Sequence, residues 1–479
     1  MKKREFTEAG VLYFVATLFN KGIGFVTVPI FSRILTTSDY GTVTTFNTWV
    51  STIAVFMSLA LYNSVRNSFV DFEKQERPKF LSSIVSLTCI IFAVSMLVCA
   101  AGLYLIPINV NIALVFLCLI QSFGNALIND YSYYLMMNYQ YKARTAIMVL
   151  PSLISVIFSI IAILFIVEDN LYMGRIVPTT IVFGLFSIII LIAVFRKARP
   201  QLNKKYLKYG LAISLPLVLH SVALHILSQS DRIMITAFRG SSETGIYSLV
   251  YNLSMIATVI TTSLDGIWVP WFIERLDKRE LKEVNVLVMD YVHLMTYAMV
   301  SLILVGPEIV KIFADSRYWE GISIIPPIVL ANYFIFMYTL YVNIEHFHKK
   351  TPYITVNTLI AAGTNLILNF IFIPRYGYVA AAYTTLVAYV IAFVLHARYA
   401  KKIEPELYPL KMFVVPLIQI AIAIIIYYPF IDYWWIRWPI MIVYVCAMFV
   451  KERYRIGIFL PKLSAKYAFF REKNEKYSD

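Results

Sequence analysis

Charged residues are scarce in this chain, and the shortage excludes most classes of soluble protein. Asp, Glu, Lys and Arg make up 15% of its 479 residues, while 59% are hydrophobic. A soluble domain carries about 25% charged residues, so this chain cannot cover itself with polar surface in water. Disorder, a collagen-like fold and a coiled coil are excluded by the same composition. The sequence therefore predicts an all-α integral membrane protein.

Cysteine is equally scarce, and its spacing excludes a metal centre. The four cysteines, Cys89, Cys99, Cys118 and Cys446, lie inside apolar runs and have no ligand-like spacing. We interpret them as packed hydrophobic residues, in neither disulfides nor a metal site. The sequence also has no phosphate-binding P-loop and no long polar segment for a soluble catalytic domain. Enzyme activity is therefore not expected.

Long apolar runs are what the chain has instead. A membrane-spanning helix needs about 20 mostly apolar residues. The first run follows a short basic N-terminus and has no cleavage site, so we interpret it as a spanning helix and not a signal peptide. Fourteen runs are predicted to span the membrane: 10–32, 42–63, 80–104, 111–137, 146–167, 176–195, 209–230, 246–272, 285–305, 321–342, 353–373, 378–397, 412–430 and 434–450.

The positive charges support this set of spans. If the chain alternates sides at each run, 33 of the 42 Lys and Arg residues fall on the side of the N-terminus and 8 on the other side. Cytoplasmic loops of membrane proteins carry such an excess. The net charge of +14 is thus explained without nucleic acid. Both termini are predicted to lie in the cytoplasm.

The two halves of the chain resemble each other at a nearly constant offset. Ser38–Gly41 matches Ser242–Gly245 at an offset of 204, and Arg144-Thr145 matches Lys350-Thr351 at an offset of 206. Each match falls at the same place in a unit of six predicted helices. Six is an even number, so the two units have the same orientation and are expected to be related by an axis along the membrane normal.

The repeat divides the chain into four predicted parts. Two six-helix bundles occupy residues 1–208 and 209–408, two additional helices occupy 409–450, and a basic cytoplasmic tail occupies 451–479. Two bundles around such an axis are the usual construction of an alternating-access carrier. Transport is therefore the predicted activity.

Two basic residues are the leading candidates for the substrate site. A charge at the bilayer centre costs at least about 2.5–3.5 kcal/mol, so it usually faces a cavity or a partner. Lys21 lies near the middle of the first span, and His225 occupies the equivalent position in the second bundle. Together they would form a basic centre between the bundles. The alternatives are snorkelling of Lys21 to an interface and ordinary packing of His225.

Further candidates lie toward the ends of the spans. Arg33, Arg66 and Arg232 are candidates for substrate binding, and anchoring at the membrane interface is the alternative for each. Asp290 and His293 lie three residues apart on one helical face. A carboxylate beside an imidazole can titrate in the physiological range, so this pair is a candidate for proton coupling, with a plain interface pair as the alternative.

Several motifs in the second half, and their counterparts in the first span, resemble a known family. The series, in this order, is similar to bacterial polysaccharide biosynthesis flippases of the Wzx type, in the superfamily that also holds multidrug and lipid II exporters. The matching residues are Pro29, Arg33-Ile34-Leu35, Tyr40-Gly41, Asp231, Gly245, Tyr247, Pro307–Phe313, Ala314-Asp315, Tyr318-Trp319, Lys349–Thr351, Asn365, Asn369, Ile373–Gly377 and Ala380–Thr385.

The resemblance implies a function. Proteins of this kind move an undecaprenyl-pyrophosphate-linked oligosaccharide, such as an O-antigen, capsule or exopolysaccharide repeat used in lipopolysaccharide or surface polysaccharide, to the outer leaflet of the bacterial inner membrane. It implies a role for Lys21 in holding the anionic headgroup. The expected partners are this substrate, membrane lipids and the polysaccharide polymerase or assembly machinery, with the chain acting as a monomer. No cofactor is expected beyond H⁺ or Na⁺ as a coupling ion.

Two other functions remain open. The first is a multidrug or small-cation antiporter of the same superfamily, which would need an acidic cavity where a flippase needs a basic one. The second is a membrane scaffold whose basic tail, residues 451–479, docks a cytoplasmic partner or anionic lipid.

Overall fold

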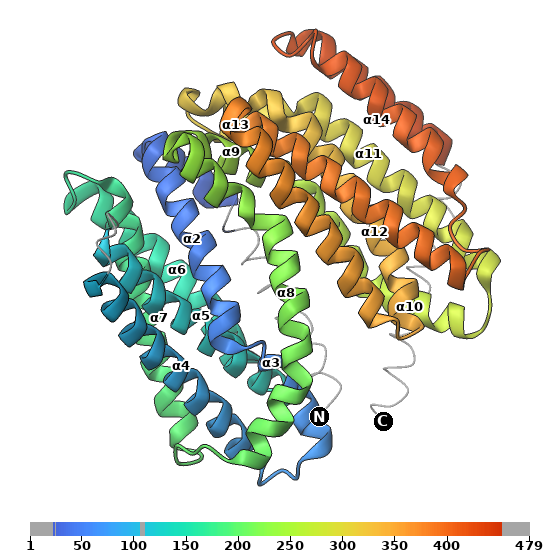
Figure 1. Ribbon diagram of the computed structural model, residues 1–479. Helices are drawn as coiled ribbons and strands as arrows, with labels where there is room; N and C mark the ends of the chain where they lie inside the picture. Colours follow the sequence, from blue (N-terminus) through green and yellow to red (C-terminus); the bar gives the residue numbers. More distant parts are fainter. Residues whose placement is uncertain (1–22, 24, 106–110, 453–479) are drawn as a thin grey trace, which may run out of the picture. The chain divides into compact units, whose positions relative to one another are not determined.

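The fold is entirely helical in the part of the chain that the structure describes. The computed structural model describes residues 23, 25–105 and 111–452, and no strand occurs among them (Figure 1). Ten of the helices are long and apolar enough to cross a membrane. The predicted class, a multi-pass helical membrane protein, is confirmed, whereas the count of fourteen spans stays a prediction.

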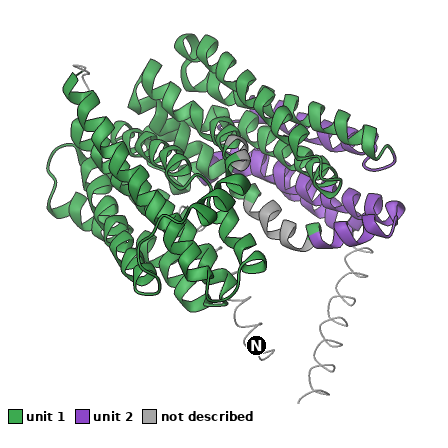
Figure 2. Cartoon of the chain, turned by 60° about the horizontal axis from the view of Figure 1, so that its bottom comes forward, with its two compact units in different colours: residues 1–269, 310–405 green, residues 270–309, 406–479 purple. Residues whose placement is uncertain are grey.

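The chain forms two compact units (Figure 2). Unit 1 comprises residues 1–269 and 310–405, and unit 2 comprises residues 270–309 and 406–479. The predicted division into two six-helix bundles and two extra helices stays a prediction.

The described helices follow one another along the chain with short connections. They are a short helix Phe25–Ile34, then α2 (Thr37–Ser58), α3 (Tyr62–Asp71), α4 (Arg77–Leu105), α5 (Ile112–Met137), α6 (Tyr141–Phe165), α7 (Leu171–Phe195), α8 (Lys204–Arg239), α9 (Ser241–Ser254), α10 (Ile256–Asp277), α11 (Leu281–Phe313), the 3₁₀ helix η1 (Ser316–Ile324), α12 (Ile325–Phe347), α13 (Thr351–Ile403), the 3₁₀ helix η2 (Leu410–Phe413), α14 (Val414–Tyr427) and a last helix Trp434–Glu452.

Local sequence explains where the helices of unit 1 begin and bend. Thr36 caps α2: its hydroxyl accepts a hydrogen bond from the Asp39 backbone, while the Asp39 carboxylate accepts one from the Thr36 backbone. This reciprocal capping box satisfies two backbone donors that a helix start leaves unpaired. Inside α13, Gly377 has φ of +62°, a conformation that glycine adopts without steric cost. The kink there joins two of the predicted spans.

The internal repeat predicted from the sequence recurs in the contacts of unit 1. The Asp39 carboxylate accepts a hydrogen bond from the backbone N–H of Tyr172 at 3.2 Å, and the Glu243 carboxylate accepts one from Tyr378 at 3.1 Å. The acids lie 204 residues apart in the sequence and the tyrosines 206. In each half, therefore, an acid in the first turn of one helix holds the backbone at the start of another, at α7 and after the kink of α13.

The two repeats meet at a pair of equivalent glycines. Gly41 of α2 and Gly245 of α9 lie where these helices cross, and a Cβ on either would collide with backbone atoms of the other helix. The hydroxyls of Thr37 and Ser242 are 2.7 Å apart beside this crossing. Small residues let two helices approach closely within a membrane, so the glycines set this contact.

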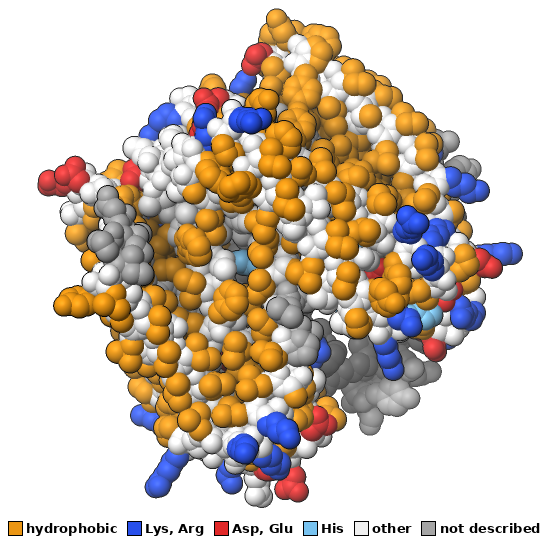
Figure 3. Space-filling model, in the orientation of Figure 1, with side chains coloured by type: hydrophobic (Ala, Val, Ile, Leu, Met, Phe, Trp, Pro, Cys, Tyr) orange, Lys and Arg blue, Asp and Glu red, His pale blue; other side chains and the backbone are white. Residues whose placement is uncertain are grey.

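The outer faces of several unit 1 helices are apolar. Val94, Leu97 and Val98 on α4 and Leu185 and Ile188 on α7 are all exposed. Hydrophobic side chains cover most of the face seen in Figure 3, and Lys and Arg gather toward its margins. Exposed apolar surface of this extent marks a contact with lipid, in keeping with a membrane-spanning fold.

Unit 2 contains an ion pair between a fully buried arginine, Arg437, and a mostly buried glutamate, Glu308. Arg437 has no exposed surface, and its guanidinium binds the Glu308 carboxylate through two nitrogens, at 2.5 and 3.0 Å. It also donates to the carbonyls of Phe430 and Ile431. A bidentate arginine–carboxylate pair is the geometry that best offsets the cost of burying both charges. The pair therefore ties the last helix to α11 inside the unit.

Candidate functional site

A cavity of about 360 Å³ lies inside unit 1 and is lined by both halves of the repeat. Its volume is within the range of about 300–1,000 Å³ typical of small-molecule sites. Its walls carry hydroxyls, amides, three aliphatic side chains, two aromatic rings and two guanidinium groups. The lining residues are Thr27, Val28, Phe31, Leu35, Tyr40, Val43, Thr44, Asn47, Thr48, Ser51, Arg175, Gln229, Arg232 and Asn252.

Arg232 of α8 is one of the two charged residues in this wall. Its side chain is nearly buried, at 3% exposure. The guanidinium donates to the Ser228 carbonyl one turn earlier at 3.1 Å and lies 4.7 Å from the ring centre of Tyr251. These contacts fix the guanidinium but include no carboxylate. Arg232 thus presents a positive charge that no acid neutralises among the described residues.

Arg175 of α7 is the second charged residue. Its guanidinium donates to the Ser159 hydroxyl at 3.1 Å and the Ser155 carbonyl at 3.4 Å, both on α6. It also lies 4.4 Å from the ring centre of Phe31. In the described part of the chain, no carboxylate contacts this guanidinium either, so the cavity has two arginines and no acidic lining residue.

The residue before Arg232 has a different environment. Asp231 is fully buried, and its carboxylate accepts hydrogen bonds from Asn369 at 2.7 Å, Tyr247 at 2.6 Å and Thr385 at 2.7 Å. Successive residues of a helix point about 100° apart, so Asp231 faces α9 and α13 while Arg232 faces the cavity. The Asp231 carboxylate is held in this hydrogen-bond network and forms no ion pair with the guanidinium of Arg232.

His225 lies about two helical turns before Arg232 and contacts the other half of the repeat. Its Nε2 is 2.9 Å from the hydroxyl of Ser51 on α2. The imidazole lines a small void of about 70 Å³ with Thr52 and Gln229. Ser51 also lines a second cavity of about 400 Å³, whose wall has no charged residue. His225 and Ser51 therefore stand where the two larger cavities approach each other.

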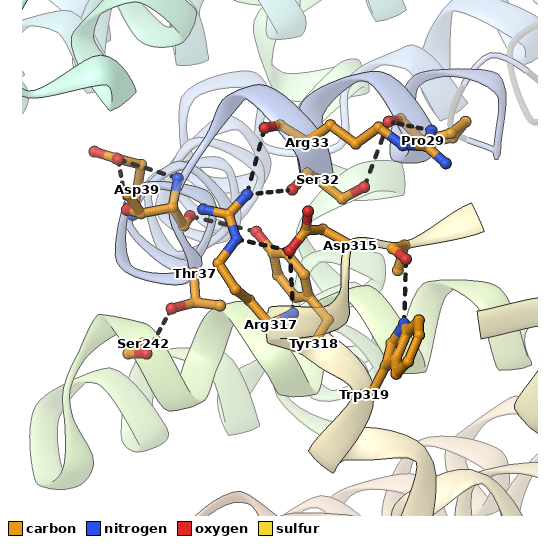
Figure 4. A network of polar contacts seen from close by, with 12 residues as sticks. Pro29, Ser32, Arg33, Thr37, Asp39, Ser242, Asp315, Arg317, Tyr318 and Trp319 are labelled. Carbon is orange, nitrogen blue, oxygen red and sulfur yellow. Dashed lines mark hydrogen bonds and ion pairs between the residues drawn. The ribbon is translucent and has the colours of Figure 1, made fainter. Parts of the chain in front are cut away.

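A cluster of polar contacts lies at the end of the bundle where α2 begins (Figure 4). Arg317 donates to the carbonyls of Ser32 and Arg33, at 3.2 and 3.3 Å, and to the Asp315 carboxylate at 2.8 Å. Arg33 in turn donates to the Ile312 carbonyl at 3.2 Å. Because Arg317 donates to it, the Asp315 carboxyl has a pKa below its usual value and stays charged at neutral pH. We call these five residues the clasp.

The clasp adjoins the cavity through two tyrosines. Tyr318, the residue after Arg317, donates to the Thr36 carbonyl at 3.3 Å. Its ring packs edge-on against Tyr40, with the ring centres 5.8 Å apart, and Tyr40 lines the cavity. The clasp therefore joins η1 to the helix Phe25–Ile34 and to α2 at one end of the cavity.

The structure brings together only part of the site predicted from the sequence. Arg232 lines the cavity and His225 lies beside it, but Lys21 lies outside the described residues. Arg33 belongs to the clasp, and Arg66 is exposed on α3. Neither of these two lines the cavities described above. The roles in substrate binding stay predictions.

The candidate coupling residues lie in unit 2. Asp290 and His293 are on α11, three residues apart as predicted. The Nδ1 of His293 is 3.8 Å from the Glu452 carboxylate, and its ring stacks on Tyr297. The role of this pair in coupling is not tested by these contacts and stays a prediction.

Arg175 is the charged residue of the cavity wall that was not predicted from the sequence. It lies one residue before a predicted span, where arginine normally anchors a helix at the interface. One signal was present in the sequence: Asn170 and Gly377, at corresponding places in the two halves, are residue types that tolerate a positive φ, and both have one. The helix α7 begins directly after Asn170, earlier than its apolar run, and carries Arg175 into the wall.

Comparisons with known proteins agree with this geometry. The family model described as "Polysaccharide biosynthesis protein" matches residues 7–275. A protein of the Lsg locus of Haemophilus influenzae is 24% identical over 284 residues, which are 57% of this chain and 67% of that protein.

Solved structures show the same fold. An inward closed conformation of the lipid II flippase MurJ has a TM-score of 0.69 at 19% identity, over 93% of this chain and 100% of that one. An inward-facing multidrug resistance transporter of the MATE family, in the MOP superfamily, has a TM-score of 0.59 at 14% identity, over 81% and 96%.

Proposed function

The chain belongs to the polysaccharide biosynthesis protein family, and on that premise we propose that it is a flippase of lipid-linked oligosaccharides. The substrate would be an undecaprenyl-pyrophosphate-linked repeat unit of an O-antigen, capsule or exopolysaccharide. The flippase would move it from the cytoplasmic to the outer leaflet by alternating access. The chain would lie in the bacterial inner membrane as a monomer with both termini in the cytoplasm.

The observation that carries this proposal is the charge of the cavity. Arg175 and Arg232 line it without a carboxylate partner among the described residues. A buried charge without a partner is costly, so the site favours an anionic ligand that supplies the missing charge. Hydrogen bonds between charged groups contribute about 1.5–3 kcal/mol each, and arginine binds phosphate oxygens in a bidentate geometry. A pyrophosphate fits this chemistry.

The rest of the wall suits a sugar. Hydroxyls and amides of Thr44, Asn47, Thr48, Gln229 and Asn252 face the same cavity. These groups both donate and accept hydrogen bonds, as a carbohydrate requires. The polyprenyl tail would remain in the bilayer beside the apolar outer helices.

The multidrug alternative meets a physical obstacle in this wall. A cationic drug needs an acid to receive it, and the two arginines would repel it at close range. The coupling ion, H⁺ or Na⁺, remains a proposal with Asp290 and His293 as candidates, as does contact with a polysaccharide polymerase or assembly machinery.

The experiment is mass spectrometry of the lipid fraction in the native host after depletion of this protein. Depleted cells are complemented with the wild type, with the Arg175→Gln/Arg232→Gln double variant, or with Arg196→Gln. Arg196 is exposed and lines none of the cavities described above, so it is the matched control for loss of an arginine. Immunoblots of the membrane fraction verify that each variant is inserted.

The expected result is that the double variant behaves like depletion. An undecaprenyl-pyrophosphate oligosaccharide accumulates at least about 10-fold, because loss of two charged hydrogen bonds weakens binding by that much or more. Surface polysaccharide falls, and Arg196→Gln is normal. Normal surface polysaccharide in the double variant would overturn the assignment of the cavity. Unchanged lipid intermediates with raised susceptibility to cationic dyes would favour the drug antiporter.

A further inference from the structure

A buried carboxylate and imidazole face each other near one end of α12 and α13, away from the cavity. The Glu345 carboxylate on α12 is 2.8 Å from Nδ1 of His396 on α13. Their side chains have 0% and 1% exposure. We call Glu345 and His396 the buried pair. None of the cavities described above is lined by either residue.

The buried pair has no other charged partner among the described residues. Glu345 and His396 form an ion pair with each other alone. The titratable groups nearby are His346 and Tyr338 on α12 and Tyr399 on α13, whose ring stacks on Tyr353. No charged side chain of α8, α9 or η1, the other described elements that contact α12 or α13, forms an ion pair with Glu345 or His396. The pair must therefore balance its own charge.

Charge balance means that the buried pair holds one proton. With one proton shared between carboxylate and imidazole the pair is neutral overall, whether the proton is on nitrogen or on oxygen. Loss of that proton leaves a net negative charge, and gain of a second leaves a net positive charge. An uncompensated buried charge is strongly disfavoured. The pair therefore keeps its single proton in the described arrangement, and it loses that proton or gains a second one only when its surroundings change.

The buried pair differs from a purely structural contact in its unpaired hydrogen-bonding atoms. Glu345 Oε1 and His396 Nε2 have no hydrogen-bond partner among the described protein atoms. Buried polar atoms are almost always paired in a structural contact. The ring of His396 is held by stacking on Tyr338, with ring centres 5.5 Å apart. The orientation is thus fixed while one donor or acceptor on each residue stays open to a further partner.

A second carboxylate–imidazole contact connects this region to the surface. His348, just past the end of α12, lies 2.9 Å from the carboxylate of Glu404, just past the end of α13, with 25% and 7% of their side chains exposed. We call His348 and Glu404 the rim pair. His346 stands between the two pairs along α12. The lysines beside the rim pair, Lys349-Lys350 and Lys401-Lys402, are on the side that the charge distribution predicts to be cytoplasmic.

We propose that the buried pair is a proton-binding site that exchanges with the cytoplasmic side through His346 and the rim pair, and that release of its proton is linked to the transport cycle. The ligand is H⁺, taken up from and returned to water, so no other reactant is needed. Proton release is linked to transport because the contact between Glu345 and His396 joins α12 to α13. Loss of the proton weakens this contact and so changes how the two helices pack. This link to transport rests on the proposed function, whereas proton binding does not.

Proton binding is tested on the purified full-length protein without substrate. Protein in lipid nanodiscs is denatured with SDS at about pH 8, above the ordinary pKa of histidine, and the protons released on unfolding are counted with an indicator dye. Wild type is expected to release one proton more per chain than Glu345→Gln. Glu320→Gln, which removes an exposed carboxylate elsewhere, is the matched control and should release as many as wild type.

Folding of the variants before denaturation is controlled in the same experiment. If Glu345→Gln aggregates on size-exclusion chromatography, the Glu345→Gln/His396→Gln variant replaces it, since two amides can keep a hydrogen bond without charge. The same deficit of one proton is expected. Equal proton release from wild type and either folded variant would overturn the proton site.

The link to transport is tested separately in liposomes loaded with a lipid-linked oligosaccharide. The rate of flipping by wild type is expected to change with the pH on the side of the lysine-rich helix ends, and Glu345→Gln should have a flat pH profile. A wild-type pH profile in Glu345→Gln would overturn the linkage. Absence of flipping by wild type at every pH would instead contradict the proposed function and leave the proton count intact.

Discussion

Two adjacent residues of α8, Asp231 and Arg232, show that the position of a charged side chain around a membrane helix determines whether it is paired within the protein or faces a cavity. Asp231 is held by three hydrogen bonds and Arg232 faces the cavity without an acid. The first contact set stabilises the fold, and the second leaves a charge available to a ligand. The sequence made Arg232 a candidate for substrate binding with interface anchoring as the alternative, and only the side-chain geometry distinguishes its environment from that of Asp231.

The role of Asp231 predicts a loss of stability on truncation. Asp231→Ala leaves Asn369, Tyr247 and Thr385 without their common acceptor. Each buried group left unpaired costs about 1–3 kcal/mol, so the unfolding free energy should fall by about 3 kcal/mol or more. Thermal unfolding in detergent measures this, and Asp169→Ala, an exposed aspartate in the α6–α7 loop, is the control. Equal melting temperatures for the two variants would show that the network contributes little.

At the scale of elements, the crossing of α2 and α9 depends on the absence of two side chains. A Cβ on Gly41 would collide with the Ser241 backbone. Gly41→Ala is therefore expected to force the helices apart and to destabilise the protein by about 1–3 kcal/mol, as overpacking does. The measurement is again thermal unfolding.

A matched glycine provides the control for this prediction. A methyl group added to Gly363 in α13 would meet no atom within 4 Å, so Gly363→Ala should be neutral or stabilising by up to about 1 kcal/mol through helix propensity. If Gly41→Ala were as stable as Gly363→Ala, the close crossing would not be a constraint on the fold.

The elements show how far sequence reasoning reaches. The apolar runs predicted the long helices because hydropathy and charge are local properties. The offsets near 204 predicted a repeat that recurs in the contacts of Asp39 and Glu243. The sequence predicted two separate spans on either side of Gly377, whereas the structure has one helix, α13, that kinks there. A glycine shortly after a proline is equally typical of a loop, so the continuity of the helix was not predicted.

The site was harder to predict than the fold. Arg232, which lines the cavity, was a candidate because a charge near a span is unusual, and its role stays a prediction. Arg175 was missed because the span boundary was placed one residue after it, and the boundary depends on the contact between Asp39 and the start of α7. Pairing of Glu345 with His396, 51 residues apart, was invisible since nothing local in the sequence indicates which faces of α12 and α13 meet.

At the scale of the whole transport cycle, the contacts beside the cavity must break if the proposal of alternating access is right. The two halves of the repeat touch through the hydroxyls of Thr37 and Ser242, 2.7 Å apart, and of Thr45 and Thr236, 2.6 Å apart. Such contacts join the two halves of the repeat in the described state. Movement of the halves apart would require them to separate, so a covalent bond across them should stop transport.

The Thr37→Cys/Ser242→Cys variant supplies that bond. The two hydroxyl oxygens are 2.7 Å apart, so sulfurs on the same two Cβ atoms can approach to the bond length of about 2.05 Å by modest side-chain rotation. Cys446 is exposed and is replaced by serine to prevent other crosslinks. The oxidised variant in liposomes should flip no lipid-linked oligosaccharide, and a reductant should restore the rate, whereas each single cysteine variant should flip normally under both conditions. Full activity of the crosslinked protein would mean that the two halves stay joined at this contact throughout the cycle, and the substrate would then have to leave between helices and not through an opening of the two halves.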